Sequence, residues 1–306
     1  MAREQLGICA EANLHGSYLL LNAAEGHERV LRSKLARLPQ LFDRLAEHFS
    51  ESLLSGVVAV GSSYWDLLYP DARPADFSGF TESVLNDIDL APMPVDLLIQ
   101  IRSDRQDVNV ISCQQVLQLL HGHVEVQDHL QGFRYLDGRN LTGFVDTPWN
   151  PKARQRRQTS LIDPGEQPVF AAGSYVYLQQ LRFDHLSWQQ LSTTEQENIV
   201  GYDKVSAKAL DGDRLLADSH RMMMQSWSDI PDVLMQNMPS YQVQRQGLIQ
   251  VGYAATMQAL QTQLRHRCGL TPGCAGHDLL LNYHSFELSA AFFAPSISFL
   301  ELAAKS

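Results

Sequence analysis

Three absences bear on where the protein works. No apolar run approaches the ~18 consecutive residues that a membrane-spanning helix needs. The opening residues, Met-Ala-Arg-Glu-Gln, are too polar for a secretory signal peptide. Cysteine is scarce, with four in 306 residues, which is typical of proteins from reducing compartments. We therefore expect a cytoplasmic protein that neither enters a membrane nor depends on disulfide bonds.

Positive charge is also in short supply. The chain has 24 lysines and arginines against 34 aspartates and glutamates, a formal net charge of −10. Such a field repels nucleic-acid phosphates and anionic lipid surfaces, so neither is an expected partner. What the chain does have is an ordinary globular composition, with 44% hydrophobic and 19% charged residues. A sizeable hydrophobic core can therefore form without disulfide bonds.

The first half of the chain alternates strand-like and helix-like patterns. Buried runs at 16–23, 56–61 and 95–102 predict strands, and a less regular segment at 122–136 predicts a fourth. Between them, leucines and phenylalanines spaced by three and four residues predict an amphipathic helix from Leu31 to Phe49, kinked at Pro39, and the pattern at 104–121 predicts a second helix. This order is that of a ferredoxin-like domain.

The second half repeats the order. Alternation predicts a strand at 173–183, Ser192 to Glu195 form a capping box that opens a helix, 231–237 and 247–253 predict a strand pair, and apolar residues from 257 to 264 mark a later helix. Both halves begin with Gly-Ser-Tyr, at 16–18 and 173–175, which hints at a duplication. We predict an α+β fold of two ferredoxin-like halves, residues 1–137 and 138–306, with the connecting loop and the functional site in the second.

One cluster resembles a metal site in composition but not in spacing. Cys268, Cys274 and His277 form a Cys-x5-Cys-x2-His set in a Gly/Pro-rich turn, a spacing that no common zinc motif has as a complete set. Free thiols in a loop are the better interpretation, with a structural metal as the alternative.

The most informative stretch is Leu-Thr-Gly-Phe-Val-Asp-Thr-Pro-Trp-Asn-Pro, at 141–151. Here a lone acid, Asp146, lies in a glycine-bounded, proline-rich turn at the start of a long irregular connection, and such connections are usually functional or disordered. The simple alternative is an aspartate that hydrogen-bonds its own backbone, as most do in turns. The surrounding sequence decides between these interpretations.

Several separated segments resemble the dye-decolourising peroxidases, in the right order and over nearly the whole chain. They are Gly132–Arg139, Gly143 with Asp146, Asn150–Arg154, Gly173–Tyr175, Ile199–Gly201, Asp218–His220, Gln236–Pro239 and Phe292–Ser296. The likeness is greatest to the compact bacterial B-type members. It implies a fold of two ferredoxin-like halves that form a dimeric-type α+β barrel, in agreement with the pattern above, and it implies haem b as cofactor.

The resemblance also implies roles for two residues. His220 matches the family's proximal haem ligand, and a neutral imidazole suits iron. The alternative is a buried histidine bonded to a backbone carbonyl. Asp146 matches the distal acid–base, which takes a proton from hydrogen peroxide and returns it to the departing oxygen. By the same resemblance Asn150, Arg154 and Met235 would lie at the cofactor, although Arg154 is equally well explained as a solvated loop cation.

The chain departs from the family at Met235, where a distal arginine normally precedes the segment Gln236–Pro239. The arginine stabilises developing negative charge and lowers the pKa of the distal aspartate, and methionine does neither. Losing one such donor commonly costs ~10²–10³ in rate. Asn237 could compensate in part as an uncharged donor. The second glycine of the Gly-x-x-Asp-Gly signature is also replaced, by Thr147.

Together these observations predict a haem-dependent peroxidase with weak ordinary peroxidase activity, acting on hydrogen peroxide and a small molecule or on a specialised small substrate. Two alternatives stay open on the same fold: a non-catalytic haem-binding or storage protein, and a haem-free pseudoenzyme. The family commonly self-associates, so a homo-oligomer is expected.

Overall fold

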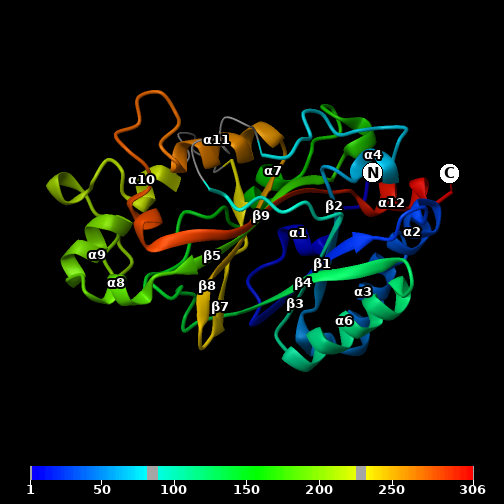
Figure 1. Cartoon of the computed structure of the whole chain (residues 1–306), viewed down its shortest axis with the longest axis horizontal. Coiled ribbons are helices and arrows are strands. Elements are labelled where there is room, and N and C mark those ends of the chain that lie inside the picture. The colour runs from blue at the N-terminus through cyan, green and yellow to red at the C-terminus, as the bar shows by residue number, and fades with distance from the viewer. Residues whose placement is uncertain (1, 81–88, 225–231, 306) are drawn as a thin grey trace.

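The computed structural model describes residues 2–80, 89–224 and 232–305. Its strands form one nine-stranded sheet that runs through the whole molecule, in the order β4-β1-β3-β2-β9-β5-β8-β6, with β7 paired to β8. In Figure 1 most of the first half lies on one side of the view and most of the second half on the other, with α12 beside α2 on the side of the first half, and the sheet continues from one half into the other.

The first half has the strand order of a ferredoxin-like domain, β4-β1-β3-β2. Its neighbouring strands are antiparallel. Helices α3 and α6 lie together against this half (Figure 1). The bounds are α1 Leu6–Cys9, β1 His15–Ala23, α2 Glu28–Leu35, α3 Leu38–His48, a 3-10 turn Ser50–Ser52, β2 Ser55–Gly61, α4 Trp65–Leu68, β3 Leu97–Ser103, α6 Gln106–Leu120 and β4 Val124–Phe133.

The second half repeats that order as β9-β5-β8-β6, so the predicted α+β fold with two ferredoxin-like halves is confirmed. The bounds are α7 Arg154–Ser160, a 3-10 turn Pro168–Phe170, β5 Ser174–Phe183, α8 His185–Gln189, α9 Thr193–Val200, a 3-10 turn Gly212–Arg214, α10 His220–Met224, β6 Leu234–Met235, β7 Met238–Gln242, β8 Arg245–Ala254, α11 Met257–Arg267, a 3-10 turn Leu279–Tyr283, β9 His284–Ala294 and α12 Ile297–Ala303.

The two half-sheets meet along a short seam. Only Val60 and Gly61 of β2 pair with β9, opposite Phe293 and Phe292. At the far ends of the sheet β4 and β7 lie against each other, since a Cβ built on Gly132 would sit 2.5 Å from that of Met238. The sheet therefore curls into a barrel-like shape with an inner and an outer face.

Side-chain alternation along the strands fills both faces. The outer face packs under the helices around Trp65, and the inner face is filled from both halves. In β3, Leu97, Ile99 and Ile101 belong to the outer cluster, and Leu98 to the inner one. By the same alternation the polar residues 100 and 102 point inward.

The end of the chain completes the first half. Helix α12 contacts α2, and Phe299 packs on Trp65 and Tyr69 with ring centroids 5.8 and 5.1 Å apart. The main-chain N–H of Ile297 donates to the carbonyl of Arg3 (2.8 Å). The buried amide of Gln5 donates to the carbonyl of Pro295 (2.8 Å). The first and last segments thus lie side by side, as the N and C labels of Figure 1 show.

Three sequence expectations need correction or limitation. The single kinked helix is wrong: α2 ends at Leu35 and α3 begins at Leu38, because Pro39 lacks an N–H and is accommodated in a first turn. The strand expected at 231–237 begins at Leu234 and is interrupted before β7, and residue 231 lies outside the described residues. The repeated Gly-Ser-Tyr does open equivalent strands, but Tyr18 faces inward and Tyr175 outward.

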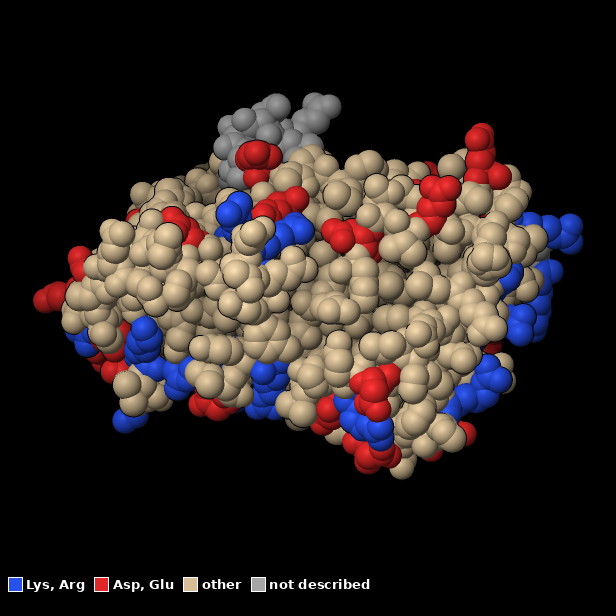
Figure 2. Space-filling model, turned by 60° about the horizontal axis from the view of Figure 1, so that its bottom comes forward, with Lys and Arg blue, Asp and Glu red and all other residues tan. Residues whose placement is uncertain are grey.

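Among the described residues, no helix combines the length and the apolar character required to cross a membrane. All four cysteines are free thiols. On the face shown in Figure 2, basic and acidic side chains are interspersed around the edge and uncharged residues cover the centre. The negative net charge is therefore not gathered into a single field on that face.

Candidate functional site

The loop that carries Asp146 is held in shape by its own polar groups. The main-chain N–H of Asp146 donates to the carbonyl of Gly138 (3.0 Å). Arg139 donates to the carbonyls of Gly143 (3.0 Å) and Lys204 (2.6 Å). Gly143 has φ +89°, in the left-handed region that glycine adopts freely. The glycine-bounded turn therefore presents one carboxylate at a fixed position.

Three donors converge on that carboxylate. Asn140 Nδ2 donates to Oδ1 of Asp146 (3.1 Å), and Asn237 Nδ2 (3.0 Å) and Thr147 Oγ1 (3.1 Å) donate to Oδ2. Removal from water raises the pKa of Asp146 above its ordinary value, and these three hydrogen bonds and the charge of His220 only partly oppose the rise. No guanidinium contributes, and the direction agrees with the expectation from the missing arginine.

Thr147 has an unfavourable backbone for its residue type. It stands where the signature has its second glycine, and its φ is +43°. A β-branched residue in the left-handed region is strained, by about 1–3 kcal/mol. The hydrogen bond from its hydroxyl to Asp146 offsets part of that cost. The turn of this chain thus has a left-handed backbone at Thr147 although the residue is not glycine.

Asn150 and Met235 are brought together by the main chain. The amide of Asn150 donates to the carbonyl of Met235 (2.7 Å), and its oxygen accepts from the N–H of Met235 (2.9 Å). Both polar groups of Asn150 are thereby used to fix β6 against the loop. Contact of Asn150 with a cofactor stays a prediction, and what the geometry gives directly is the placement of Met235, which is 7% exposed.

A second polar cluster surrounds His220 at the start of α10. Its Nδ1 lies 2.7 Å from Oδ2 of Asp278, which also accepts from Nε of Arg267 (3.0 Å). The other oxygen of Asp278 accepts from the N–H of Leu280 (3.0 Å). The Asp278 side chain is fully buried. Burial alone would raise its pKa, but the charge and hydrogen bond of His220, with Arg267, outweigh burial and hold the pKa well below its ordinary value.

This arrangement fixes the tautomer of His220. In the neutral imidazole, a proton on Nδ1 that Asp278 accepts leaves the lone pair on Nε2. Among the described residues Nε2 has no hydrogen-bond partner. A buried histidine held by a carbonyl, the alternative interpretation, is not what the structure shows: the partner is a carboxylate. One ring nitrogen is thus held by a carboxylate and the other is left available, an arrangement common to histidines that bind metals.

The two clusters adjoin each other. Trp149, three positions beyond Asp146 in the same loop, packs edge-on against the His220 ring with centroids 5.5 Å apart. Met235 and Arg267 line one small cavity, together with Gln250, which accepts from Arg267 (2.7 Å). The position where the family has an arginine thus holds the thioether of Met235. The cation that lines this cavity, Arg267, is already paired with Asp278.

Two predicted positions lie apart from this centre. Arg154 is exposed at the start of α7, and its side chain forms no hydrogen bond or ion pair with the described residues. In the thiol cluster, Cys274 lies against His266 (Sγ to Nδ1, 3.2 Å), and His277 instead contacts Asn282 (2.9 Å). The three residues of the Cys-x5-Cys-x2-His set therefore do not converge.

Comparison with known proteins decides the family. Models of the N-terminal and C-terminal domains of Dyp-type peroxidases match residues 5–134 and 137–299. The chain belongs to the Dyp-type peroxidase family. It is 31% identical over 290 residues to a dye-decolorizing peroxidase of Mycolicibacterium paratuberculosis, covering 93% of this chain and 81% of that one.

Solved structures of the family agree. A putative dyp-type peroxidase from Shewanella oneidensis is 33% identical with a TM-score of 0.93, and the match covers 99% of both chains. A DypB variant from Rhodococcus jostii, solved in complex with haem, is 28% identical with a TM-score of 0.87, over 95% of this chain and 96% of that one.

Sequence reasoning missed Asp278 and Arg267. Asp278 lies 58 positions from His220 in a turn rich in glycine, and only the fold brings its carboxylate to the imidazole. Arg267 is in the last turn of α11, where a basic residue is ordinary. Neither position carried a local signal. For Asp146, Asn237, Asn150 and Met235 the structure does bring together what the sequence singled out.

Proposed function

We propose that this chain is a haem-dependent peroxidase in which His220 binds the iron of haem b and Asp146 transfers protons. The observation that carries the proposal is the pairing of His220 with Asp278, which leaves Nε2 free as a ligand. The haem complex of the Rhodococcus jostii relative supports the choice of cofactor. Family membership supports the use of hydrogen peroxide to oxidise small molecules.

The ligand set fits haem better than a bare metal ion. In the described parts of the chain no three histidine, cysteine, aspartate or glutamate side chains converge as metal ligands. A porphyrin brings four nitrogens of its own, so a single protein imidazole suffices. Met223 and Met224, which follow His220 in α10, are buried apolar side chains. Bound haem would supply the redox-active iron at which hydrogen peroxide is reduced.

Asp146 has the position and partners of a proton carrier. As a carboxylate it accepts a proton from hydrogen peroxide, and as the acid it returns that proton to the departing oxygen. Asn140 and Asn237 hold its two oxygens, so the unused lone pairs have fixed directions. Because the pKa of Asp146 is raised, a larger fraction of its carboxyl groups is protonated in mildly acidic solution. The protonated form cannot accept the proton of peroxide.

Met235 sets the expected strength of the activity. No positive charge stands at this position to stabilise the departing oxygen, and Arg267 is engaged with Asp278 and Gln250. One missing electrostatic donor costs ~10²–10³ in rate. Peroxide turnover below that of relatives with the arginine is therefore expected. The same substitution is the one observation in favour of the second candidate, a haem carrier without turnover.

The test is an absorption titration of the protein with haem, followed by hydrogen peroxide. The wild-type chain should give a Soret band that changes on addition of peroxide. His220→Ala should lose the band, whereas His277→Ala, at an exposed histidine that contacts Asn282, should keep it. A normal Soret band in His220→Ala would overturn the ligand assignment. A Soret band indifferent to peroxide would favour the carrier.

Two further proposals concern the setting of the protein. We propose that it forms a homo-oligomer, as its family commonly does, which light scattering on purified protein would test. We also propose that it works in the cytoplasm, which cell fractionation would test.

A further inference from the structure

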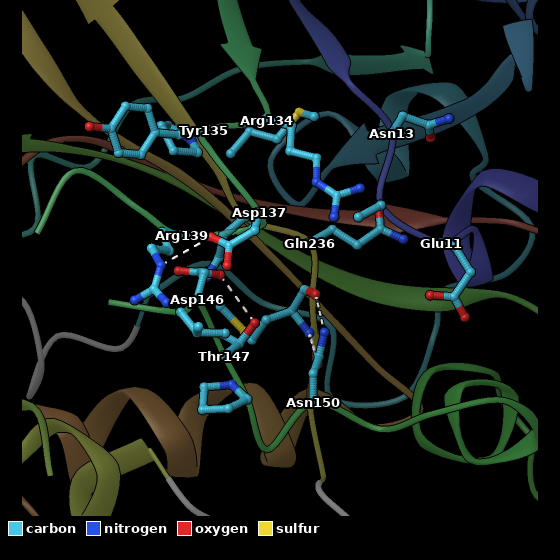
Figure 3. Close-up of a pocket in the computed structure, with 18 of the residues that line it drawn as sticks. Glu11, Asn13, Arg134, Tyr135, Asp137, Arg139, Asp146, Thr147, Asn150 and Gln236 are labelled. Carbon is cyan, nitrogen blue, oxygen red and sulfur yellow. Dashed lines mark hydrogen bonds and ion pairs between the residues drawn. The ribbon is translucent and has the colours of Figure 1, made fainter. Parts of the chain in front are cut away.

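A cavity of about 640 Å³ is lined by residues of both halves of the molecule, Asp146 among them. Figure 3 shows Asp146, Thr147 and Asn150 on one side of it, Glu11 and Asn13 on the other, and Gln236 between them. Its volume is in the range of pockets that bind drug-sized molecules. A molecule in it would lie against the carboxylate that the proposed function assigns to proton transfer.

The charge of this cavity is opposite to that of the chain. Five basic residues line it, against three acidic ones; they are Arg102, Arg134, Arg139, Lys152 and Arg156, and Glu11, Asp137 and Asp146. Two of the cations are paired, Arg139 with Asp137 (3.0 Å) and Arg156 with Glu11 (3.7 Å). The other three have no carboxylate partner among the described residues. The cavity thus carries a local excess of positive charge in a protein with net charge −10.

Arg102 is the unusual member of this set. It belongs to β3, on the inward face, and is 1% exposed. Its Nη1 donates to Oε1 of Gln236 (2.7 Å), a neutral oxygen, while its Nε has no acceptor. Its Nη2 also has no acceptor among the residues that the structure describes. A buried cation ordinarily has a carboxylate or another anion beside it, because desolvation is costly.

A purely structural role inside the barrel does not explain why this residue, Arg102, is an arginine. Gln236 is already fixed by its amide, which donates to the carbonyls of Gly7 (3.0 Å) and Ile8 (2.7 Å), and its Oε1 also accepts from Gln100 (2.8 Å). The contact from Arg102 uses one of five N–H groups. A guanidinium with unused N–H groups at the edge of a cavity is a usual means of binding a carboxylate.

We propose that Arg102 binds the carboxylate of a small aromatic acid in this cavity, so that aromatic carboxylates are preferred substrates of the site. Phe133, Tyr135, Met238 and Pro239 supply apolar wall for a ring. Arg134 and Lys152, both exposed, would attract the anion from solution. As a statement about substrates the inference rests on the proposed function, whereas the binding itself does not.

Calorimetric titration with benzoate, without peroxide, of protein prepared with added haem tests the binding. Benzyl alcohol serves as the uncharged analogue with the same ring. Benzoate should bind at least about tenfold more tightly than benzyl alcohol, because a hydrogen bond to a charged group commonly raises affinity by about tenfold or more. High ionic strength should weaken benzoate binding and leave benzyl alcohol unchanged.

Variants identify the anchor. Arg102→Gln should weaken benzoate binding about 10- to 100-fold and leave benzyl alcohol unaffected. Arg44→Gln makes the same change of charge at an exposed site on α3 outside the cavity, and should bind benzoate as the wild type does. Because Arg102 is buried, Arg102→Lys provides a second variant that keeps the charge and loses the fork. It should weaken benzoate binding severalfold, again without effect on benzyl alcohol.

Equal affinity for benzoate and benzyl alcohol, or benzoate binding that survives in folded Arg102→Gln or is unchanged in Arg102→Lys, would overturn the inference. The same preparations are tested for a Soret band and for its response to peroxide. Protein that reacts with peroxide but does not bind benzoate overturns the substrate inference alone. Protein that binds benzoate through Arg102 but gives no Soret band supports the anchor and overturns the proposed function alone.

Discussion

Replacing Asp278 with asparagine tests the proximal cluster most sharply, because a carboxamide cannot satisfy all three of its donors. The carboxylate accepts from His220 and Arg267 at one oxygen and from the N–H of Leu280 at the other. If the amide oxygen of Asp278→Asn faces Leu280, its NH₂ meets the N–H groups of His220 and Arg267. If the amide is turned over, its NH₂ meets the N–H of Leu280. At least one buried donor group is unpaired in either orientation.

The magnitude follows from burial. Asp278 is fully buried and the Arg267 side chain is 5% exposed, so the substitution also leaves a buried guanidinium without its anion. Breaking a buried pair in this way costs about 3–5 kcal/mol in the free energy of unfolding. Where His220 responds by moving its proton to Nε2, it can no longer ligate a metal. Loss of an outer-shell partner commonly weakens metal binding about 10- to 100-fold.

The assay is haem titration of apo-protein followed at the Soret band, with denaturant unfolding measured on the same samples. Asp218→Asn is the matched control, because it removes the same charge two residues from His220 at a side chain that forms no hydrogen bond or ion pair with the described residues. If Asp278→Asn binds haem as tightly as Asp218→Asn does, the carboxylate is not what prepares His220, and the reasoning fails.

Three further predictions concern the distal side. Met235→Arg should raise peroxide turnover, up to about 10²-fold, by supplying the missing positive charge; unchanged turnover in stopped-flow assays would mean that this charge is not limiting. Asn237→Ala removes a hydrogen bond that lowers the pKa of Asp146, so this pKa should rise. The acid limb of the pH–rate profile should therefore move to higher pH, and a shift to lower pH would contradict the role of Asn237. Thr147→Gly should relieve about 1–3 kcal/mol of backbone strain, against a lost hydrogen bond of about 1 kcal/mol and about 0.5–1 kcal/mol of added unfolded-state entropy. The free energy of unfolding should therefore change little in denaturant titrations, and a fall of about 2 kcal/mol would refute the strain argument.

Much of the fold could be predicted because single strands carry their own signal. The run at 16–23 became β1, His15–Ala23, and the run at 56–61 became β2, Ser55–Gly61. The capping box of Ser192 and Glu195 opens α9 as expected. These features depend on neighbours in sequence, which a pattern can register.

What the sequence could not supply is the pairing of distant side chains. Asp278 reaches His220 only through the turn before β9, and Asn150 reaches Met235 across 85 positions. Arg102 was accessible in principle, since a basic residue at an inward position of a buried strand, after Leu98 and Gln100, is a visible anomaly. An exposed arginine such as Arg154 gives no comparable indication of its surroundings.

The contact between the two ends of the chain bears on how the protein is made. Until α12 has left the ribosome, Phe299 cannot pack on Trp65 and the carbonyl of Pro295 cannot accept a hydrogen bond from Gln5. More than half of the chain lies between β4 and α12, and at 5–20 residues per second its synthesis takes roughly 10–30 seconds. During that interval the nascent first half carries an uncovered aromatic surface around Trp65, a natural target for co-translational chaperones.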